Sequence, residues 1–238
     1  KAGLPTHTRV MHGLRLLQQH QVDFNLLCVV NNLNSAHPLE VYRFFKEIGA
    51  TWVQFIPIVE REGEGVSVRS VAPLAYGEFL AAIFDEWIRH DVGCVFVQIF
   101  EEAVAAWMGY QPSLCVFTET CGRALVLEHN GDLYSCDHFV DPPYLLGNIK
   151  TSSLQTMVDS PQQVQFGLNK KDTLPAACME CDYHFVCRGG CPKNRLTCQG
   201  LNYLCEGYRY FFTHIAPYLR RLGQLIQQGL PAPTIMSE

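Results

Sequence analysis

Cysteine is the residue type in this chain best suited to chemistry, and four cysteines lie inside one short segment. The stretch "CMECDYHFVCRGGCPKNR", residues 178–195, places Cys178, Cys181, Cys187 and Cys191 in the pattern C-x2-C-x5-C-x3-C. Turns this tight bring thiolates close enough to bind one metal centre. Four-cysteine zinc sites and four-cysteine iron–sulfur sites use the same ligands, so the spacing alone leaves both open.

Further cysteines lie on both sides of this segment: Cys115, Cys121 and Cys136 upstream, and Cys198 and Cys205 downstream. Three upstream thiols and one downstream thiol make a second set of four. In two-cluster ferredoxins the last cysteine of a local run, followed by proline, ligates the other cluster. Here Pro192 follows Cys191. We therefore favour two iron–sulfur clusters over one zinc knuckle.

Composition indicates an intracellular globular protein. The chain has 238 residues, of which 48% are hydrophobic and 17% charged, with 11 cysteines and a formal net charge of -5. That charge gives no reason to expect nucleic acid or an anionic membrane as a partner. No apolar run reaches the length of a membrane span, and no signal-peptide pattern is present. An odd number of cysteines without signs of secretion favours metal or redox sites in the cytoplasm over disulfides.

The first half of the sequence alternates between helical and strand patterns. Helical spacing or helix signals cover 8–21, 38–49, 73–90 and 101–109, and short apolar runs suited to strands buried on both faces occur at 24–30, 52–59 and 94–100. A polar loop separates them at 60–70. This alternation predicts an α/β fold with a parallel sheet or barrel.

Short elements are predicted after Cys115. Residues 123–136 are a hairpin candidate in which Asn130 and Gly131 would supply the positive φ angles of a two-residue turn. Short helices are expected within 152–170 and a longer closing helix over 206–228. We expect a division into 1–110, the last βα units of a barrel, 111–230, a cysteine-rich domain, and 231–238, a flexible tail.

The cysteine spacing resembles a known family. The pattern C121-x9-G131-x4-C136, followed by the 178–191 run and a later cysteine, looks like the SPASM domain of radical S-adenosylmethionine enzymes. Within that group, "CDHFV" (136–140), "LGNI" (146–149), "CRGGCPK" (187–193) and "NYLCEGY" (202–208) resemble the anaerobic sulfatase-maturating enzymes. "FNLLCVVNN" and "VQFIP" are similar to late barrel strands of that family. The resemblance implies the C-terminal part of a partial (β/α)6 barrel followed by a SPASM domain.

The resemblance also implies cofactors and ligands. Two auxiliary [4Fe–4S] clusters are expected, besides S-adenosylmethionine and a third [4Fe–4S] cluster in the complete enzyme. Cluster I would be held by residues matching Cys115, Cys121, Cys136 and Cys191, and cluster II by residues matching Cys178, Cys181, Cys187 and Cys205. Cys198, Cys28 and Cys94 have no counterpart and are expected to be ordinary packing residues.

Two other positions are implied by the family match. Asp137 lies where the family has its catalytic base, which would take the proton of the substrate thiol or hydroxyl while a cluster accepts an electron. By residue type alone, Asp137 would be a turn residue. Val59 matches a position that lines the S-adenosylmethionine pocket, and by itself it is the end of a buried strand.

The implied activity is oxidation of a cysteine or serine of a target sulfatase to formylglycine. The substrate would be an unfolded C/S-x-P-x-R segment, and the electron donor a flavodoxin or ferredoxin. The C-x3-C-x2-C motif of radical enzymes is not found in this sequence. We therefore expect a C-terminal fragment that is inactive alone. The alternatives are another SPASM-type peptide-modifying enzyme, which would form thioether or carbon–carbon crosslinks, and a zinc-binding structural module.

Overall fold

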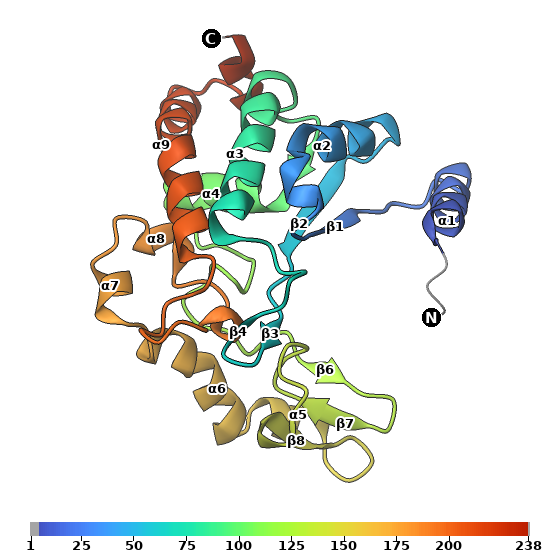
Figure 1. Ribbon diagram of the computed structural model, residues 1–238, viewed down its shortest axis with the longest axis vertical. Helices are drawn as coiled ribbons and strands as arrows, with labels where there is room; N and C mark the ends of the chain where they lie inside the picture. Colours follow the sequence, from blue (N-terminus) through green and yellow to red (C-terminus); the bar gives the residue numbers. More distant parts are fainter. Residues whose placement is uncertain (1–4, 238) are drawn as a thin grey trace.

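Three parallel strands and their connecting helices form one half of the molecule. In the computed structural model, which describes residues 5–237, the sheet order is β1 (Leu26–Val30), β2 (Trp52–Pro57) and β5 (Phe96–Val97). Leu26 pairs with Val53 and Trp52 with Phe96. The 3-10 helix η1 (Asn34–Ala36) and helix α2 (Pro38–Glu47) connect β1 to β2, and α3 (Pro73–His90) precedes β5 (Figure 1). The predicted α/β class is confirmed.

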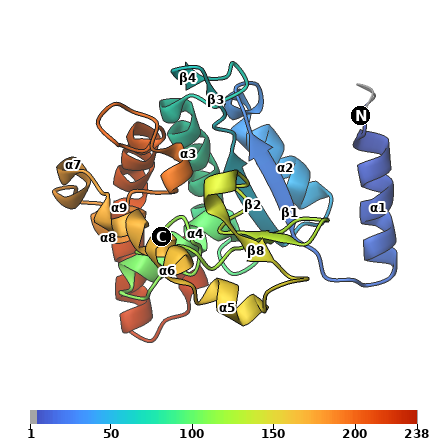
Figure 2. The ribbon, with the colours of Figure 1, turned by 90° about the horizontal axis from the view of Figure 1, so that it is seen from below.

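The sheet is buried on one face, which corrects the expectation of strands covered on both faces. Burial alternates along β1, where Val30 is fully buried while Leu27 and Val29 are 57% and 48% exposed. The period-2 alternation of a strand explains the pattern, because helices pack against one side only. Helix α1 (His7–Gln19) lies apart from the sheet, beside α2, as Figure 2 shows.

The strand predicted at 94–100 is mostly wrong. Only Phe96 and Val97 form β5, and α4 (Gln98–Trp107) begins immediately after them. Ile99, Phe100 and Ala103 are buried on this helix. A short apolar run cannot distinguish a buried strand from a buried helix, which is why the pattern misled.

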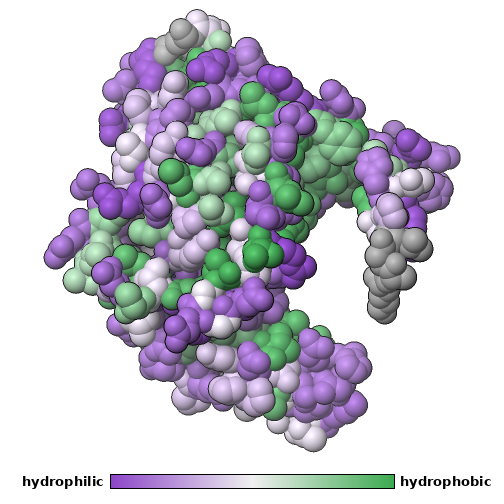
Figure 3. Space-filling view, in the orientation of Figure 1, coloured by the Kyte–Doolittle hydropathy of each residue, from purple (hydrophilic) through white to green (hydrophobic). Residues whose placement is uncertain are grey.

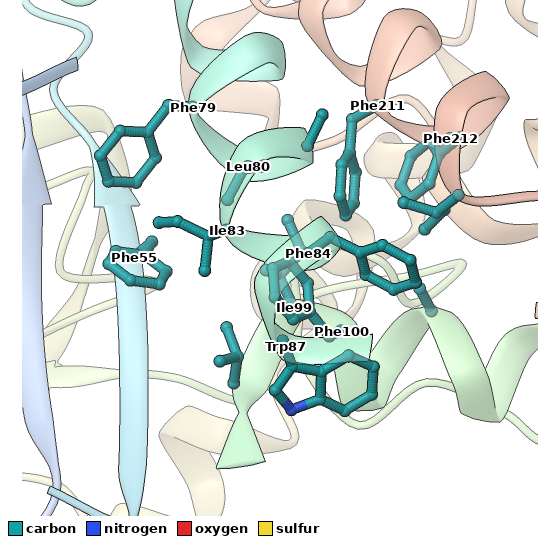
Figure 4. Close-up of a cluster of buried hydrophobic side chains, with 14 of the residues drawn as sticks. Phe55, Phe79, Leu80, Ile83, Phe84, Trp87, Ile99, Phe100, Phe211 and Phe212 are labelled. Atoms are coloured by element: carbon teal, nitrogen blue, oxygen red, sulfur yellow. The ribbon is translucent and has the colours of Figure 1, made fainter. Parts of the chain in front are cut away.

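The main core lies between α3, α4 and the closing helix α9 (Cys205–Gln227) (Figure 4). Phe84 on α3 is at its centre and makes edge-to-face contacts with Phe100 and Phe211, at centroid distances of 5.2 and 6.4 Å. Such aromatic pairs stabilise beyond the area that they bury. The last long helix of the chain therefore belongs to the core of the first half.

The other half contains a small antiparallel sheet of β6 (Val126–Leu127), β7 (Asp132–Tyr134) and β8 (Leu145–Asn148). It is followed by short helices α5 (Leu154–Val158), α6 (Pro161–Asp172), α7 (Ala176–Met179) and α8 (His184–Cys187). The 3-10 helix η2 (Pro142–Tyr144) lies between β7 and β8, and η3 (Pro192–Asn194) lies between α8 and α9. In Figure 1, the sheet and α5–α6 form the end of the molecule farthest from η4 (Ala232–Ser237).

The predicted hairpin exists, but its turn differs. Gly131 has a φ of 97°, whereas Asn130 does not have a positive φ, and the Gly131 N–H donates to the Glu128 carbonyl at 2.9 Å. The loop is thus longer than two residues. Asn130 accepts a hydrogen bond from the Asp132 N–H instead, at 3.0 Å. This side-chain turn is a common alternative use of asparagine.

A short hairpin, β3 (Arg61–Glu62) and β4 (Gly65–Val66), forms within the segment expected to be a loop. It lies between the two halves (Figure 1). The space-filling view shows a hollow on one side of the molecule, bordered by both halves and α1 (Figure 3).

Ile235 in η4 is buried. The division at 110 and 230 and the flexible tail stay predictions. None of the helices within residues 5–237 is both long and apolar enough for a membrane span.

Candidate functional site

The downstream set of cysteines surrounds a cavity. Its four members come from α7, the α7–α8 turn, the end of α8 and the start of α9. The cavity has a volume of about 320 Å³, and the cysteines among its lining residues are Cys178, Cys181, Cys187 and Cys205. Four thiols around an enclosed space are the donor set that a four-iron cluster requires. The residues present therefore fit such a group.

The same four thiols influence one another electrostatically. The pKa of Cys187 is raised to about 12, first by burial and then by Cys205, Cys178 and Cys181 as neighbouring groups that become negative. Burial is also the first cause of the raised pKa of Cys205, to which Cys181 adds. Metal binding takes deprotonated thiols and so releases these protons.

The cysteines of the upstream set also lie close enough to one another for their charges to interact. Burial raises the pKa of Cys191, and Cys115 and Cys121 add to this effect. Burial raises the pKa of Cys136 to about 12, and Cys191 is among its negative neighbours. Cys191 thus groups with cysteines 55 or more positions upstream rather than with its sequence neighbour Cys187. The two predicted ligand sets are each assembled, although the ligand roles themselves stay a prediction.

Backbone N–H groups already face several of the sulfur atoms. The backbone N–H groups of Gly122, His138, Gly189 and Lys193 lie near the thiols of Cys121, Cys136, Cys187 and Cys191, respectively, and as potential donors they lower the pKa of each thiol against the effect of burial. Hydrogen bonds of this kind favour the thiolate form and tune iron–sulfur clusters. They are a second observation that fits both sets to this cofactor.

The turn between Cys187 and Cys191 needs its glycines. Arg188, Gly189 and Gly190 follow one another with φ angles of 48°, 73° and 62°. Such left-handed backbone favours glycine. A Cβ on Gly190 would stand 2.5 Å from Nδ2 of Asn202. Asn202 itself donates to the Cys191 carbonyl at 3.1 Å, so it fixes this turn against the segment that enters α9.

Two buried charged residues hold the loop around Cys115. Glu102 on α4 accepts hydrogen bonds from the Ser113 N–H at 2.7 Å and the Leu114 N–H at 3.0 Å. Lys170 on α6, with 0% exposure, donates to the carbonyls of Cys115 at 2.8 Å and Val116 at 2.9 Å. Neither residue was singled out in the sequence, where each looks like an ordinary charge on a helix.

Asp137 is exposed and lies directly beside the upstream set. The Cys136 thiol donates to its Oδ1 at 3.2 Å. His138 and Lys193 are close enough for their charges to interact, and Lys193 also acts on Glu60, the residue after Val59. Val59 is 2% exposed and packs in the core. The roles predicted for Asp137 and Val59 remain untested.

The remaining cysteines stand apart from both sets. Cys28 is buried in the core, and Cys94 and Cys198 are exposed. Within residues 5–237, no three His, Cys, Asp or Glu side chains are arranged to hold a single metal ion.

The domain around these thiols is of a known class. Residues 115–182 match SPASM, described as an iron–sulfur cluster-binding domain. The match includes Cys115, Cys121, Cys136, Cys178 and Cys181 and ends before Cys187. This part of the chain matches an iron–sulfur cluster-binding domain, which supports the auxiliary [4Fe–4S] clusters expected from the sequence.

The chain as a whole is homologous to anaerobic sulfatase-maturating enzymes. It is 46% identical to a serine-type enzyme of Bacteroides thetaiotaomicron, over 98% of this chain and 61% of the relative. A serine-type enzyme of Klebsiella pneumoniae is 38% identical, over 92% and 55% of the two chains. A cysteine-type enzyme of Clostridium perfringens is 29% identical, over 94% and 63%. The chain thus spans about 61% of the length of the first of these relatives.

The fold agrees with solved structures of the same group. Native anSMEcpe with bound AdoMet and a peptide called Kp18Cys superposes with a TM-score of 0.83 at 28% identity, covering 93% of this chain and 63% of that one. A second structure, with AdoMet and the Cp18Cys peptide, gives the same score over 94% and 64%. The AdoMet and the peptides belong to those proteins.

Proposed function

We propose that this chain acts in a radical S-adenosylmethionine maturase that oxidises a residue of a sulfatase to formylglycine. The observation that carries the proposal is the pair of interleaved four-thiol sets with Asp137 beside one of them. The identity to maturating enzymes over 98% of the chain supports it. Cluster I would be held by Cys115, Cys121, Cys136 and Cys191. Cluster II would be held by Cys178, Cys181, Cys187 and Cys205.

Serine is the target that the relatives favour. The two serine-type enzymes are 46% and 38% identical to this chain, and the cysteine-type enzyme is 29% identical. The substrate would be an unfolded segment of the type C/S-x-P-x-R. A flavodoxin or ferredoxin would supply electrons, in the cytoplasm.

Conversion of serine to formylglycine removes two hydrogens from its side chain. The bound cofactors would supply hydrogen abstraction and electron acceptance. The chain itself supplies Asp137, an exposed carboxylate that can take the hydroxyl proton. Val59 would support the S-adenosylmethionine pocket from the core side.

The test has two stages. Iron and acid-labile sulfide are first measured on this chain after anaerobic reconstitution, and about eight of each are expected for two four-iron clusters. Zinc without sulfide would refute the proposal. The chain is then joined to the part of the Bacteroides relative that the match leaves uncovered. This chimera is assayed with matched serine and cysteine peptides.

Asp137→Asn in that chimera should suppress formylglycine formation and leave S-adenosylmethionine cleavage intact, because only proton removal is lost. Asp141→Asn, another exposed aspartate on the segment after Cys136, is the control. Unchanged formylglycine yield in Asp137→Asn would remove it as the base. Crosslinked peptide instead of aldehyde would support the alternative SPASM chemistry.

A further inference from the structure

Two cationic side chains lie near the cysteine sets: Lys170 near the upstream set, and Arg195 near cysteines of both. Lys170 on α6 is fully buried. Arg195, just after η3, is half-buried, and its Nη2 donates to the Lys170 carbonyl at 2.5 Å. Its Nη1 donates to Thr173 Oγ1 at 2.9 Å. The two residues therefore form one connected unit.

Their hydrogen bonding differs in one respect. The Lys170 ammonium donates to three carbonyls, those of Cys115, Val116 and Thr118, so its three hydrogens are all used. In Arg195, by contrast, the Nε–H group is buried and has no hydrogen-bond acceptor among the described residues. A buried donor without an acceptor is costly. Its presence indicates that a group outside the protein chain accepts this hydrogen bond.

Arg195 is within electrostatic reach of both sets. Its neighbours include Cys178 and Cys187 of the downstream set and Cys121 and Cys191 of the upstream set. The guanidinium lies next to the glycine turn, where a Cβ added to Gly189 would stand 3.3 Å from Arg195 Nη2. One guanidinium thus lies within range of charge interaction with thiols of both sets.

A cation is needed at this place for electrostatic reasons. Four thiolates around a cluster would leave it with net negative charge, and Arg195 interacts with thiols of both proposed sets. Buried like charges repel, and buried charge is tolerated only when it is paired. Positive charge and N–H donors near the sulfur atoms make a cluster easier to reduce.

We propose that Arg195 is a positioning residue shared by both iron–sulfur centres: its guanidinium offsets the charge of each, and its Nε–H donates to a sulfur of one of them. The inference rests on the proposed ligand sets. If so, Arg195 influences the reduction potentials of both clusters, although it is a ligand of neither.

The experiment uses this chain with its clusters reconstituted anaerobically. Arg195→Gln, Arg195→Lys and the control Lys171→Gln are compared with the wild type by iron and sulfide analysis and by redox titration followed by electron paramagnetic resonance. Lys171 is a suitable control because it is close in sequence and lies on the surface, 3.4 Å from Glu119. In Arg195→Gln, both clusters should titrate at more negative potentials. In Arg195→Lys, the shifts should be smaller, since the charge remains.

Each other outcome has a defined meaning. Unchanged potentials in Arg195→Gln, or a shift in one cluster only, overturn the shared role. If Arg195→Gln loses iron, retention of both clusters in Arg195→Lys supports charge balance, and equal loss in both variants shows a purely structural role and overturns it. A wild-type chain without clusters refutes the proposed function instead, which separates the two failures.

Discussion

Gly77 on α3 and Gly207 on α9 lie against each other so closely that a Cβ on Gly77 would stand 2.4 Å from the Gly207 carbonyl oxygen. In the other direction, a Cβ on Gly207 would stand 1.9 Å from the Pro73 carbonyl oxygen. Both obstacles are backbone, which cannot rotate away. Gly207 is two residues after Cys205, so this contact also fixes the position of a proposed cluster ligand.

Gly207→Ala should therefore destabilise the protein. We expect a loss of about 1–3 kcal/mol in the free energy of unfolding, the usual cost of overpacking, although alanine is the better helix former. Denaturant unfolding of the reconstituted chain measures it. Gly13→Ala on α1 is the matched control, because no atom lies within 4 Å of its added Cβ. It should raise stability by about 0.5–1 kcal/mol. Equal effects in both variants would contradict the packing argument.

Lys170→Met should disrupt the loop around Cys115. Methionine fills a similar space but leaves the carbonyls of Cys115, Val116 and Thr118 without their donor. Each buried orphan acceptor costs about 1–3 kcal/mol. Unfolding and iron content are measured together, and about four of the irons should be lost. Lys171→Met, on the exposed neighbour, should retain them. Full iron content in Lys170→Met would show that the loop does not depend on this clamp.

The interleaving of the two sets can be tested with paired cysteine variants. Cys121→Ala combined with Cys191→Ala removes two ligands of one proposed cluster and should cost about four irons. Cys187→Ala combined with Cys191→Ala removes one ligand from each set and should impair both, with a loss approaching about eight irons. Cys198→Ala, an exposed cysteine outside both sets, should lose none. A larger loss in the first pair than in the second would reverse the assignment of Cys191.

Removal of the clusters should loosen only part of the molecule. Residues 174–205 consist of short elements held around the thiols, whereas α3 and α9 share a large aromatic core. After anaerobic chelation, limited proteolysis should cut first within 174–205 and spare α3. The reconstituted chain is the control. Early cleavage within α3 would indicate that the core itself depends on the clusters.

The alternation of helices and strands was predictable because it depends on local periodicity. Helix α3 was expected over 73–90 and is found there, since its proline start and apolar face are encoded within the segment itself. The strand at 94–100 failed because a buried helix has the same apolar run. The turn at Asn130 failed because Asn130 uses its side chain to accept from Asp132.

The cysteine sets could be anticipated from spacing and family resemblance, but their surroundings could not. Lys170 is one of two consecutive lysines, and the sequence does not show which of them is buried. Lys170 is the buried one because its ammonium group binds the loop at 115–118, which comes from a distant part of the chain. Arg195 and Asn202 are hidden for the same reason, because their partners are mostly backbone atoms of other turns.

Cys191 lies after three ligands of one proposed centre and after three of the other, and this order has a consequence for how the protein is made. The upstream centre lacks its fourth ligand until residue 191 has left the ribosome, and the downstream centre lacks its own until residue 205. Neither cluster can therefore be completed before most of the cysteine-rich segment has been synthesised. Under the proposed assignment, the machinery that delivers iron and sulfide must act late, once the segment that leads into α9 has been made.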